Sequence, residues 1–144
     1  MPREKRNYKA NRYYHLYNRG NRKLTVFYDD EDYQTFLNLL YHYSGKYKVS
    51  IEAYCLMPNH FHLLVKPLVY GEDISKMMHC TMTGFGIYIN NKYHLVGRAF
   101  QGTYKHRAIY DAIDLANVKK YFKNNPVEAQ MVTKGEYYRW LMVR

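Results

Sequence analysis

The sequence predicts an α+β fold, a sandwich in which helices pack on one face of an antiparallel sheet. Two observations lead to this prediction. Strand-like and helix-like patterns alternate along the chain in the order β-α-β-β-α-β-α, which is typical of such sandwiches. The 144 residues are 47% apolar and contain no repeat, linker or low-complexity tract, which indicates one domain over residues 1–144.

The charge and the aromatic content favour a polyanionic partner. The formal net charge is +10, from 22 Lys and Arg against 12 Asp and Glu, and such an excess promotes binding to phosphate chains through counterion release. The 18 tyrosines offer faces on which unpaired bases stack, although tyrosine is also an ordinary sheet residue. Nucleic acid is therefore the leading partner class, ahead of an anionic membrane surface.

Cysteine usage and hydropathy indicate an intracellular protein. Cys55 and Cys80 lack the spacing of metal ligands, so we expect two reduced structural thiols. The basic N-terminus is not followed by a hydrophobic signal core, and no run reaches the roughly 18 apolar residues of a membrane span. We expect a soluble cytoplasmic protein without a membrane partner.

Local signals predict the first strand and the first helix. Residues 12–17 are rich in aromatic side chains and end at a turn-like segment, 18–21, which is typical of a strand. A helix should begin near Asp29 or Asp30, because Asp29 is a good cap and acidic residues fill the first turn. Gly45 is a suitable residue for its end. The apolar positions of this helix recur at helical spacing: Tyr33, Phe36, Leu40 and Tyr43.

Two strands joined by a tight turn come next. Residues 49–56 and 60–66 have strand character, and Pro58-Asn59 supplies turn chemistry between them. Alternate residues of a strand share a face, so His60 and His62 project together and are able to bind one divalent metal. Two polar residues on a wet strand face would produce the same pattern. The histidines lie on a free face only if the intervening apolar residues pack beneath the helices: Phe61, Leu63 and Val65.

The second half of the chain continues the alternation. A helix should start near Asp73, although Gly84 and Gly86 weaken it. A loop over 97–102 then leads to a strand over 103–110, in which charged and aromatic residues interleave. With the third helix described next, this order is that of a ferredoxin/RRM-like sandwich.

The third helix carries a tyrosine in an unusual position. Asp111 is a plausible cap, and Tyr121 lies about 90° from the centre of the apolar stripe, at the border of the core face. Asp114 and Asn125 fall on the same side as Tyr121. Pro126 should end or bend the helix, which would leave the carboxamide of Asn125 free to face a ligand. An exposed Tyr-Asn pair beside a helix stop is the plainer interpretation. The apolar stripe consists of Leu115, Val118 and Phe122.

Two separated segments resemble one protein family. Leu56–Val65 (LMPNHFHLLV) and Tyr121–Val127 (YFKNNPV) are similar to the motifs of IS200-like single-tyrosine transposases, and among these most similar to the REP-associated tyrosine transposases. The segments Tyr14–Gly20, Asp29–Asp32 and Phe100–Lys105 also resemble that group and occur in the same order. The resemblance covers essentially the whole chain.

The resemblance implies a His-hydrophobic-His (HUH) nuclease that cleaves and rejoins single-stranded DNA, with its catalytic tyrosine on the C-terminal helix. By this likeness Tyr121 is the nucleophile, which forms a covalent 5′-phosphotyrosine, and His60 and His62 bind a divalent metal. Asn125 is the implied third ligand, with Glu52 on the neighbouring strand as a competing donor. Both Mg²⁺ and Mn²⁺ remain open, because Mg²⁺ prefers oxygen ligands whereas two imidazoles suit Mn²⁺ at least as well.

The same resemblance implies a substrate and a location. The expected substrate is single-stranded DNA with a hairpin or palindrome, and the expected location is the bacterial cytoplasm, in association with the nucleoid. A monomer and a homodimer are both open, because the wider group includes dimers that exchange the tyrosine helix whereas the REP-associated branch resembles monomers. The candidates for DNA contact lie on a basic N-terminal arm, at the end of the first strand and on the basic strand: Arg3, Arg6, Arg12, Arg19, Lys105, His106 and Arg107.

Three function classes are compatible with these features. The first is the metal-dependent single-tyrosine nuclease and strand transferase. The second is a non-catalytic module that stacks single-stranded nucleic acid on an open RRM-like sheet. The third is a metal-dependent phosphodiesterase that uses activated water, in which Tyr121 is only structural. The remaining histidines show no paired spacing and are expected to be mostly structural or surface residues: His15, His42, His79, His94 and His106.

Overall fold

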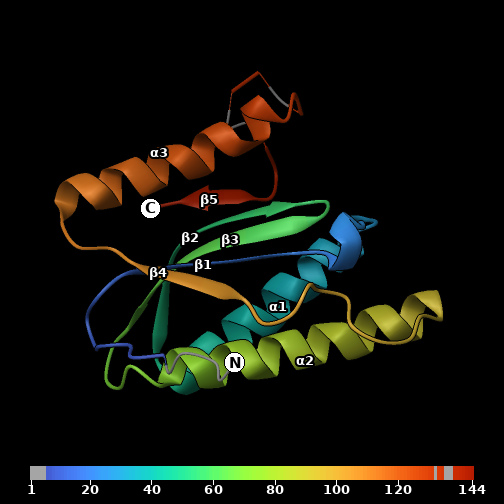
Figure 1. Cartoon of the computed structure of the whole chain (residues 1–144), viewed down its shortest axis with the longest axis horizontal. Helices are drawn as coiled ribbons and strands as arrows, with labels where there is room; N and C mark the ends of the chain where they lie inside the picture. The colour runs from blue at the N-terminus through green and yellow to red at the C-terminus, as the bar shows by residue number, and fades with distance from the viewer. Residues whose placement is uncertain (1–5, 132, 135–137) are drawn as a thin grey trace.

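A five-stranded antiparallel sheet forms the centre of the fold (Figure 1). The computed structural model describes residues 6–131, 133–134 and 138–144. The strand order is β4-β1-β3-β2-β5, so β4 and β5 form the two edges. The strands are β1 Tyr14–Arg19, β2 Val49–Met57, β3 His60–Pro67, β4 Lys105–Ala108 and β5 Leu141–Val143.

The predicted antiparallel hairpin of β2 and β3 lies at the centre of the sheet. Only the turn of Pro58 and Asn59 separates the two strands, and His62 lies opposite Cys55 on β2 and opposite Tyr17 on β1. A register shift between Ile51 and Ala53 marks a bulge in β2. Because β3 pairs on both sides, its backbone is fixed by two ladders, and its side chains are rigidly positioned.

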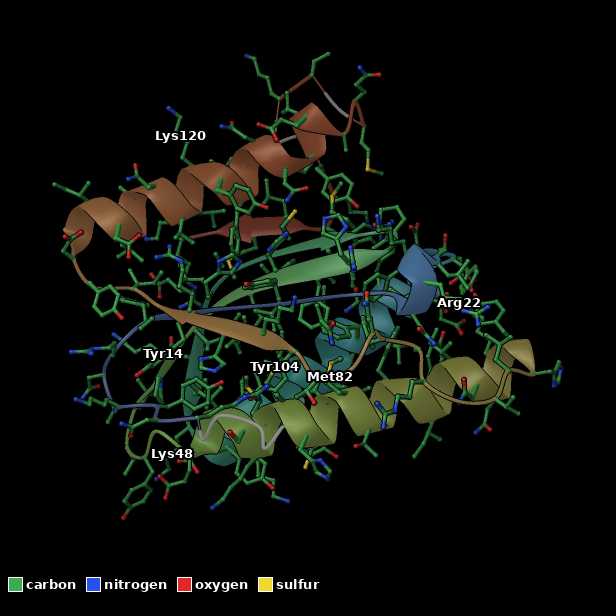
Figure 2. All side chains as sticks on the ribbon, in the orientation of Figure 1. Tyr14, Arg22, Lys48, Met82, Tyr104 and Lys120 are labelled. Atoms are coloured by element: carbon green, nitrogen blue, oxygen red, sulfur yellow. The ribbon has the colours of Figure 1, made fainter. Side chains whose placement is uncertain are left out.

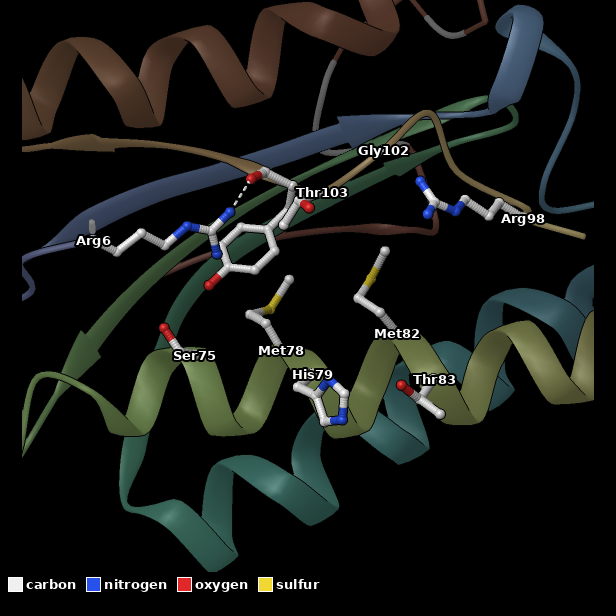
Figure 3. A pocket seen from close by; sticks show the side chains of 10 residues that line it. Arg6, Ser75, Met78, His79, Met82, Thr83, Arg98, Gly102 and Thr103 are labelled. Carbon is white, nitrogen blue, oxygen red and sulfur yellow. Dashed lines mark hydrogen bonds between the residues drawn. The ribbon is translucent and has the colours of Figure 1, made fainter. Parts of the chain in front are cut away.

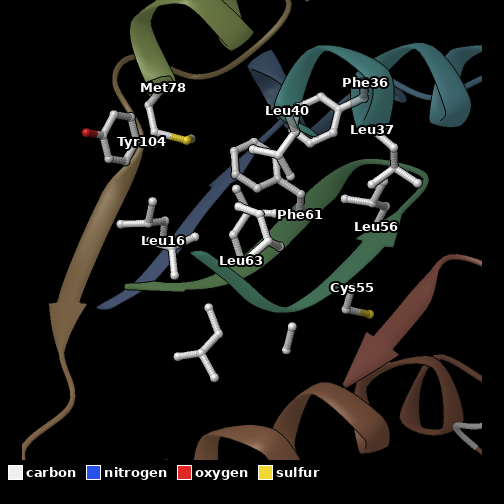
Figure 4. Close-up of a cluster of buried hydrophobic side chains, with 14 of the residues drawn as sticks. Leu16, Phe36, Leu37, Leu40, Cys55, Leu56, Phe61, Leu63, Met78 and Tyr104 are labelled. Carbon is white, nitrogen blue, oxygen red and sulfur yellow. The ribbon is translucent and has the colours of Figure 1, made fainter. Parts of the chain in front are cut away.

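Two helices cover one face of the sheet. They are α1 (Asp30–Tyr47) and α2 (Asp73–Tyr93), and they lie side by side beneath the strands in Figure 1. The side chain of Asp29 accepts a hydrogen bond from the Asp32 amide and caps α1 as predicted. Figure 4 shows Phe61 of β3 projecting toward α1, where its ring lies 5.2 Å from that of Phe36. The predicted apolar face of β3 therefore packs against these two helices.

The third helix lies on the opposite face, which differs from the predicted arrangement. This helix, α3 (Ala112–Glu128), packs above β2 and β5 (Figure 1). Its buried Phe122 ring lies 5.7 Å from the ring of His62, on the face away from Phe61. The α+β class and the antiparallel sheet are confirmed, but the helices do not all pack on one face. The buried side chains of Leu64 and Cys55 share this face with His62, so α3 shields an apolar surface from water.

Two expected helix ends also differ from the structure. Gly45 does not terminate α1, because the helix continues for two residues and Tyr47 stacks on Tyr43 one turn earlier. Pro126 does not terminate α3 at Asn125, because the buried proline ring packs within the last turn. The Asn125 carbonyl there accepts a hydrogen bond from the Ala129 amide. A proline in the last turn removes one helical hydrogen bond without ending the helix.

Strand β5 had no counterpart in the predicted order. It has three residues and pairs with the middle of β2, where Val143 lies opposite Ala53. So short a segment shows no alternation that distinguishes it from a loop. Within the described residues, none of the helices combines the length and the apolar character that crossing a bilayer requires.

Candidate active site

The two motif histidines lie on the face of β3 that α3 covers. The ring centres of His60 and His62 are 5.3 Å apart, as expected for alternate residues of one strand. His62 is buried and His60 is half-buried. The predicted juxtaposition of the two imidazoles is confirmed by this geometry.

Helix α3 brings two further side chains to the histidines. The ring of Tyr121 lies 5.3 Å from the ring of His62, edge to face, and 46% of Tyr121 remains exposed. The Oδ1 atom of Asn125 lies 3.4 Å from Nε2 of His60. The four predicted residues therefore meet, although they come from elements about 60 residues apart in sequence. Phe122, which is fully buried beneath α3, holds this helix against the sheet.

His60, His62 and Tyr121 border an open hollow of about 410 Å³. One side is formed by β1, one by β3, one by α3 and the last by the segment before β4. The side chains that line it include two cations, two imidazoles and two phenols: Tyr17, Asn18, Arg19, His60, His62, Gln101, Lys105 and Tyr121. Such a mixture suits an anionic, partly planar ligand.

Hydrogen bonding leaves one nitrogen of His60 without a proton. Its Nδ1 atom lies 2.7 Å from the amide oxygen of Asn59, and a neutral imidazole has only one N–H to donate. The shorter contact favours the proton on Nδ1, and in that tautomer Nε2 and the Asn125 oxygen face each other as two lone-pair donors. Adjacent ligands of a six-coordinate divalent ion are separated by roughly 3 Å, which is close to the observed spacing. This donor set fits a cation.

His15, which shows no paired spacing in the sequence, is also a member of this site. Its Nε2 atom lies 2.9 Å from Nδ1 of His62, and both rings are buried. His15 is on β1, directly opposite Leu64 and one position along the face from His62. Strand alternation places His15 on the same face as Tyr17, but only the pairing of β1 with β3 brings it to His62. The sequence carries no local signal for that pairing.

Burial keeps the imidazoles neutral. The pKa of His62 is lowered to about 3 by burial, with contributions from His15 and His60. The pKa of His15 is lowered to about 4 by burial and by the charge of Arg107, which lies opposite it on β4. Burial also lowers the pKa of His60. Neutral imidazoles are the form that binds a metal.

The nucleophile candidate is protonated at neutral pH. Burial raises the pKa of Tyr121 above its ordinary value, and the charge of Glu128 acts in the same direction. A protonated phenol is a poor nucleophile, so this hydroxyl needs a nearby positive charge or a proton acceptor in order to attack.

The lowered histidine pKa values predict acid sensitivity of the metal-free protein. Unfolded histidine titrates near pH 6.5, so as the pH falls the unfolded state takes up protons before His15 and His62 do in the folded state. The free energy of unfolding should have its highest value above about pH 6.5 and should decrease as the pH falls from there to about pH 4. Urea unfolding at about pH 7.5 and about pH 5 measures this. The decrease should be smaller in His15→Asn, and equal decreases in both proteins would contradict the assignment.

The predicted DNA-contact residues on the sheet fall into two groups. Arg19 and Lys105 line the hollow, and the guanidinium Nε of Arg19 donates to Gln101 at 2.6 Å. His106 and Arg107 are exposed on β4, where Arg107 forms an ion pair of 3.0 Å with Asp114.

The basic arm does not reach the hollow as one unit. Arg6 lies against Tyr104, away from the histidines, and Arg12 is exposed near the start of α3. Arg3 lies outside the described residues. Residues that are close together in the sequence of the arm therefore lie on separate parts of the surface, outside the active-site hollow.

Two further residues, one expected beside Tyr121 and one as a competing metal donor, lie elsewhere. Asp114 binds Arg107 and the Tyr110 amide, so it does not form a polar row with Tyr121. The carboxylate of Glu52, the competing metal donor, lies 3.7 Å from the ammonium of Lys119 and does not line the hollow. No group of three or more His, Cys, Asp or Glu in the described ranges is arranged to hold a metal ion. A metal here would therefore depend on an amide oxygen or on ligands from the substrate.

A comparison with protein families decides the relationship of this chain. The family model described as "Transposase IS200 like" matches residues 8–125, which extend from the first described tyrosine to Asn125. The chain belongs to the IS200-like transposase family. The resemblance inferred from the two motifs is confirmed, and membership of this family supports a transposase role and an enzyme that cleaves DNA.

Solved structures of low sequence identity share the fold of this IS200-like transposase. A REP-associated tyrosine transposase bound to a REP hairpin superimposes with a TM-score of 0.79 at 19% identity, over 98% of this chain and 82% of that one. A protein from Deinococcus radiodurans R1 that has been assigned as a transposase gives a TM-score of 0.57 at 17% identity, over 90% of this chain and 98% of that one. The sequence matches no protein of curated function.

Proposed function

We propose that this IS200-like transposase is a divalent-metal-dependent endonuclease and strand transferase that acts on single-stranded DNA through Tyr121. The observation that carries the proposal is the meeting of Tyr121 from α3 with His60 and His62 in one hollow lined by cations, with the Asn125 oxygen 3.4 Å from His60. A phenol beside a metal-donor set and beside positive charge is the constellation that nucleophilic attack on a phosphodiester requires.

The metal would be held by His60, His62 and Asn125. The unprotonated Nε2 of His60 and the facing Asn125 oxygen support this assignment, and the ion pair of Glu52 with Lys119 disfavours the alternative donor. Two nitrogen donors and one oxygen donor suit Mn²⁺ at least as well as Mg²⁺. A bound ion would offset the charge that accumulates on the phosphate during attack.

Tyr121 would then exchange one phosphoester bond for another. Its phenolic oxygen bonds to phosphorus while the bond from phosphorus to the 3′ oxygen breaks, and the phenolic proton is lost as the 3′ oxygen gains one. The 5′ phosphate stays on the tyrosine. Because the new bond is also a phosphoester, a second 3′ hydroxyl is able to reverse the step without ATP. Arg19 and Lys105, which line the same hollow, are placed to bind the phosphate.

His15 would act as a positioning residue for His62. If His62 binds metal through Nε2, its Nδ1–H must donate to another group, and the neutral Nε2 of His15 is the acceptor 2.9 Å away. The nearby charge of Arg107 helps to keep His15 in that neutral form. The second imidazole thus fixes the tautomer and the ring angle of the first.

Loss of this acceptor should weaken metal binding. His15→Leu removes the acceptor at similar volume, and we expect the Mn²⁺ dissociation constant to rise about 10-fold to 100-fold. His15→Gln keeps an acceptor oxygen and should recover part of the affinity. Isothermal titration with Mn²⁺ measures both. Equal affinities of the leucine variant and the wild-type protein would contradict the role of His15.

A DNA hairpin is the proposed partner. The net charge of +10 and the fold shared with a REP-associated transposase bound to a REP hairpin support this choice. The cationic hollow is open on one side, as a single strand beside a hairpin requires. Oligomeric state and the bacterial, nucleoid-associated location stay predictions.

The structure also bears on the two other function classes. An RRM-like binding module stacks bases on an open sheet face, but here α3 covers the face that carries the histidines. A phosphodiesterase that uses water would need Tyr121 only for packing, yet this tyrosine is 46% exposed. Both observations favour the tyrosine mechanism.

One assay separates the three classes. The wild-type protein is incubated with labelled hairpin DNA that has single-stranded tails, with Mn²⁺ or with EDTA, and the products are run on a denaturing gel. We expect a covalent protein–DNA band and a cleaved strand only with the metal. Cleavage without a covalent band would overturn the tyrosine mechanism, and binding without cleavage in either Mn²⁺ or Mg²⁺ would favour the binding module.

A further inference from the structure

A second and larger hollow lies on the other side of the segment that precedes β4. Its volume is about 920 Å³, and it lies between α2, Arg6 and the segment 98–104 (Figure 3). A smaller hollow of about 350 Å³ continues it along α2, with Met82, Thr83, Arg98 and Gly102 common to both. The larger hollow, called the α2 hollow below, is lined by Arg6, Ser75, Met78, His79, Met82, Thr83, Arg98, Gly102, Thr103 and Tyr104.

We propose that the α2 hollow binds one unpaired nucleotide of the same DNA strand that reaches Tyr121. Figure 3 shows Arg6 and Arg98 at opposite ends of the hollow, so each is placed to bind one of the two phosphates that flank a nucleotide. Between them lies an apolar floor for a base. This inference rests on the proposed function, because it requires that the protein binds single-stranded DNA.

The cation at one end is held in place before any ligand binds. The guanidinium of Arg6 lies 3.6 Å from the centre of the Tyr104 ring and donates a hydrogen bond to the Tyr104 carbonyl. Tyr104 is buried, and its hydroxyl accepts a hydrogen bond of 3.3 Å from Tyr8. The backbone of Tyr8 is in turn packed tightly against Gly71, because a Cβ at position 71 would lie 1.9 Å from the Tyr8 carbonyl oxygen. Preorganisation of this kind reduces the entropy cost of binding.

The cation at the other end is free to bind a phosphate. Arg98 is exposed and makes no hydrogen bond or ion pair with the residues that the structure describes. It follows Gly97, whose φ of +84° allows the chain to turn back from the end of α2. An arginine with unused donors at the rim of a hollow suits bidentate binding of phosphate.

The floor and the walls suit a base. Met78 and Met82 project from α2 toward the segment 98–104 (Figure 3). Met78 is fully buried beside Tyr104 (Figure 4), whereas Met82, labelled in Figure 2, is half-buried and is the thioether that a base would contact. Thioethers are polarisable and pack well against aromatic rings. Hydroxyl groups surround this floor and are able to bond to the edge of a base: Ser75, Thr83 and Thr103.

A short path connects the α2 hollow with the candidate active site. Residues of one segment line both, because Gln101 and Lys105 face the active-site hollow whereas Gly102 and Thr103 line the α2 hollow. The segment is fixed to β1, since the Gln101 amide donates to the Arg19 carbonyl at 2.9 Å. A DNA strand that crosses this segment would meet cations on both sides. The α2 hollow would thus hold the DNA strand in a fixed position relative to Tyr121.

The test compares variants that change charge with variants that change shape. Fluorescence anisotropy is measured with a labelled DNA stem-loop that has thymidine tails. Arg98→Ala should weaken binding about fivefold to tenfold and lower the slope of log K against log salt by about 1. Thr83→Trp fills the hollow from the exposed surface of α2 without any change of charge, and should weaken binding about tenfold.

Matched controls lie outside the α2 hollow. Arg139→Ala removes the same charge near the opposite edge of the sheet, where Arg139 pairs with Asp30, and Asn91→Trp places the same ring on an exposed part of α2. Both should bind DNA as the wild-type protein does. Circular dichroism of all four variants checks folding. Wild-type affinity of both Arg98→Ala and Thr83→Trp would overturn the inference.

Photocrosslinking locates the nucleotide directly. With 5-iododeoxyuridine placed at successive tail positions, one position should crosslink to a peptide that contains Met78 and Met82 or residues 98–104. Crosslinks confined to other peptides would overturn the inference and leave the proposed function intact, whereas absence of any DNA binding by the wild-type protein would overturn both. Thymidine monophosphate should not compete at the concentration of the DNA, and equal competition would assign the hollow to a free nucleotide instead.

Discussion

Tyr121→Phe should abolish the covalent protein–DNA adduct and reduce strand cleavage by at least about 10⁴-fold, the usual scale for loss of a nucleophile. The substitution removes only the phenolic oxygen, and the ring keeps its contacts with His15 and His62. No hydrogen bond of this hydroxyl to a described residue is lost, so the thermal midpoint should change little. A denaturing gel with labelled hairpin DNA and Mn²⁺ measures the adduct.

A second tyrosine of the same hollow provides the control. Tyr17 also lines the hollow, and its ring lies 6.1 Å from that of His62. Tyr17→Phe should still form the adduct. An adduct that persists in Tyr121→Phe, or that disappears only in Tyr17→Phe, would show that the nucleophile has been assigned to the wrong residue.

His60→Ala should reduce cleavage by about 10³-fold, the rate equivalent of the several kcal/mol that a metal supplies to the transition state. His60 is the better test of the metal site than His62, because it is half-buried and its replacement leaves the buried pair of His15 and His62 intact. Mn²⁺ affinity, measured by titration calorimetry, should fall in parallel. His42→Ala, an exposed change on α1, should alter neither quantity.

The same titration distinguishes the two candidates for the third ligand. Asn125→Ala should lower Mn²⁺ affinity, whereas Glu52→Gln should not, because the carboxylate of Glu52 is directed to Lys119. The opposite result would move the third ligand to β2. Unchanged Mn²⁺ affinity in His60→Ala would contradict the proposed metal site as a whole.

Features that depend on local sequence were predictable. The Pro58-Asn59 turn and the alternation from His60 onward define the central hairpin, and Asp29 and Asp111 cap the helices that follow them. These signals act over a few residues, so neighbouring side chains are sufficient to specify them. The meeting of Tyr121 with the histidines was inferred only through the family resemblance, since nothing local relates α3 to β3.

Features that depend on long-range pairing were not predictable. The face on which α3 packs follows from where β2 and β5 leave apolar surface, and β5 itself is recognisable only when it lies beside β2. His15 reaches His62 only through the pairing of two strands. The α2 hollow likewise needs Arg6 and Arg98, which are 92 residues apart, to approach the same helix. Contacts of this kind have no signature within a sequence window.

The open edge at β4 imposes a constraint of its own. An unpaired edge strand invites pairing with the edge of another molecule, and charged side chains are a common protection against such sheet extension. Lys105, His106 and Arg107 are all exposed on this edge, and β4 has only four residues. The positive charges proposed to attract DNA would therefore also keep two molecules of the protein from joining edge to edge. Neutral substitutions on β4 should promote self-association as well as weaken DNA binding.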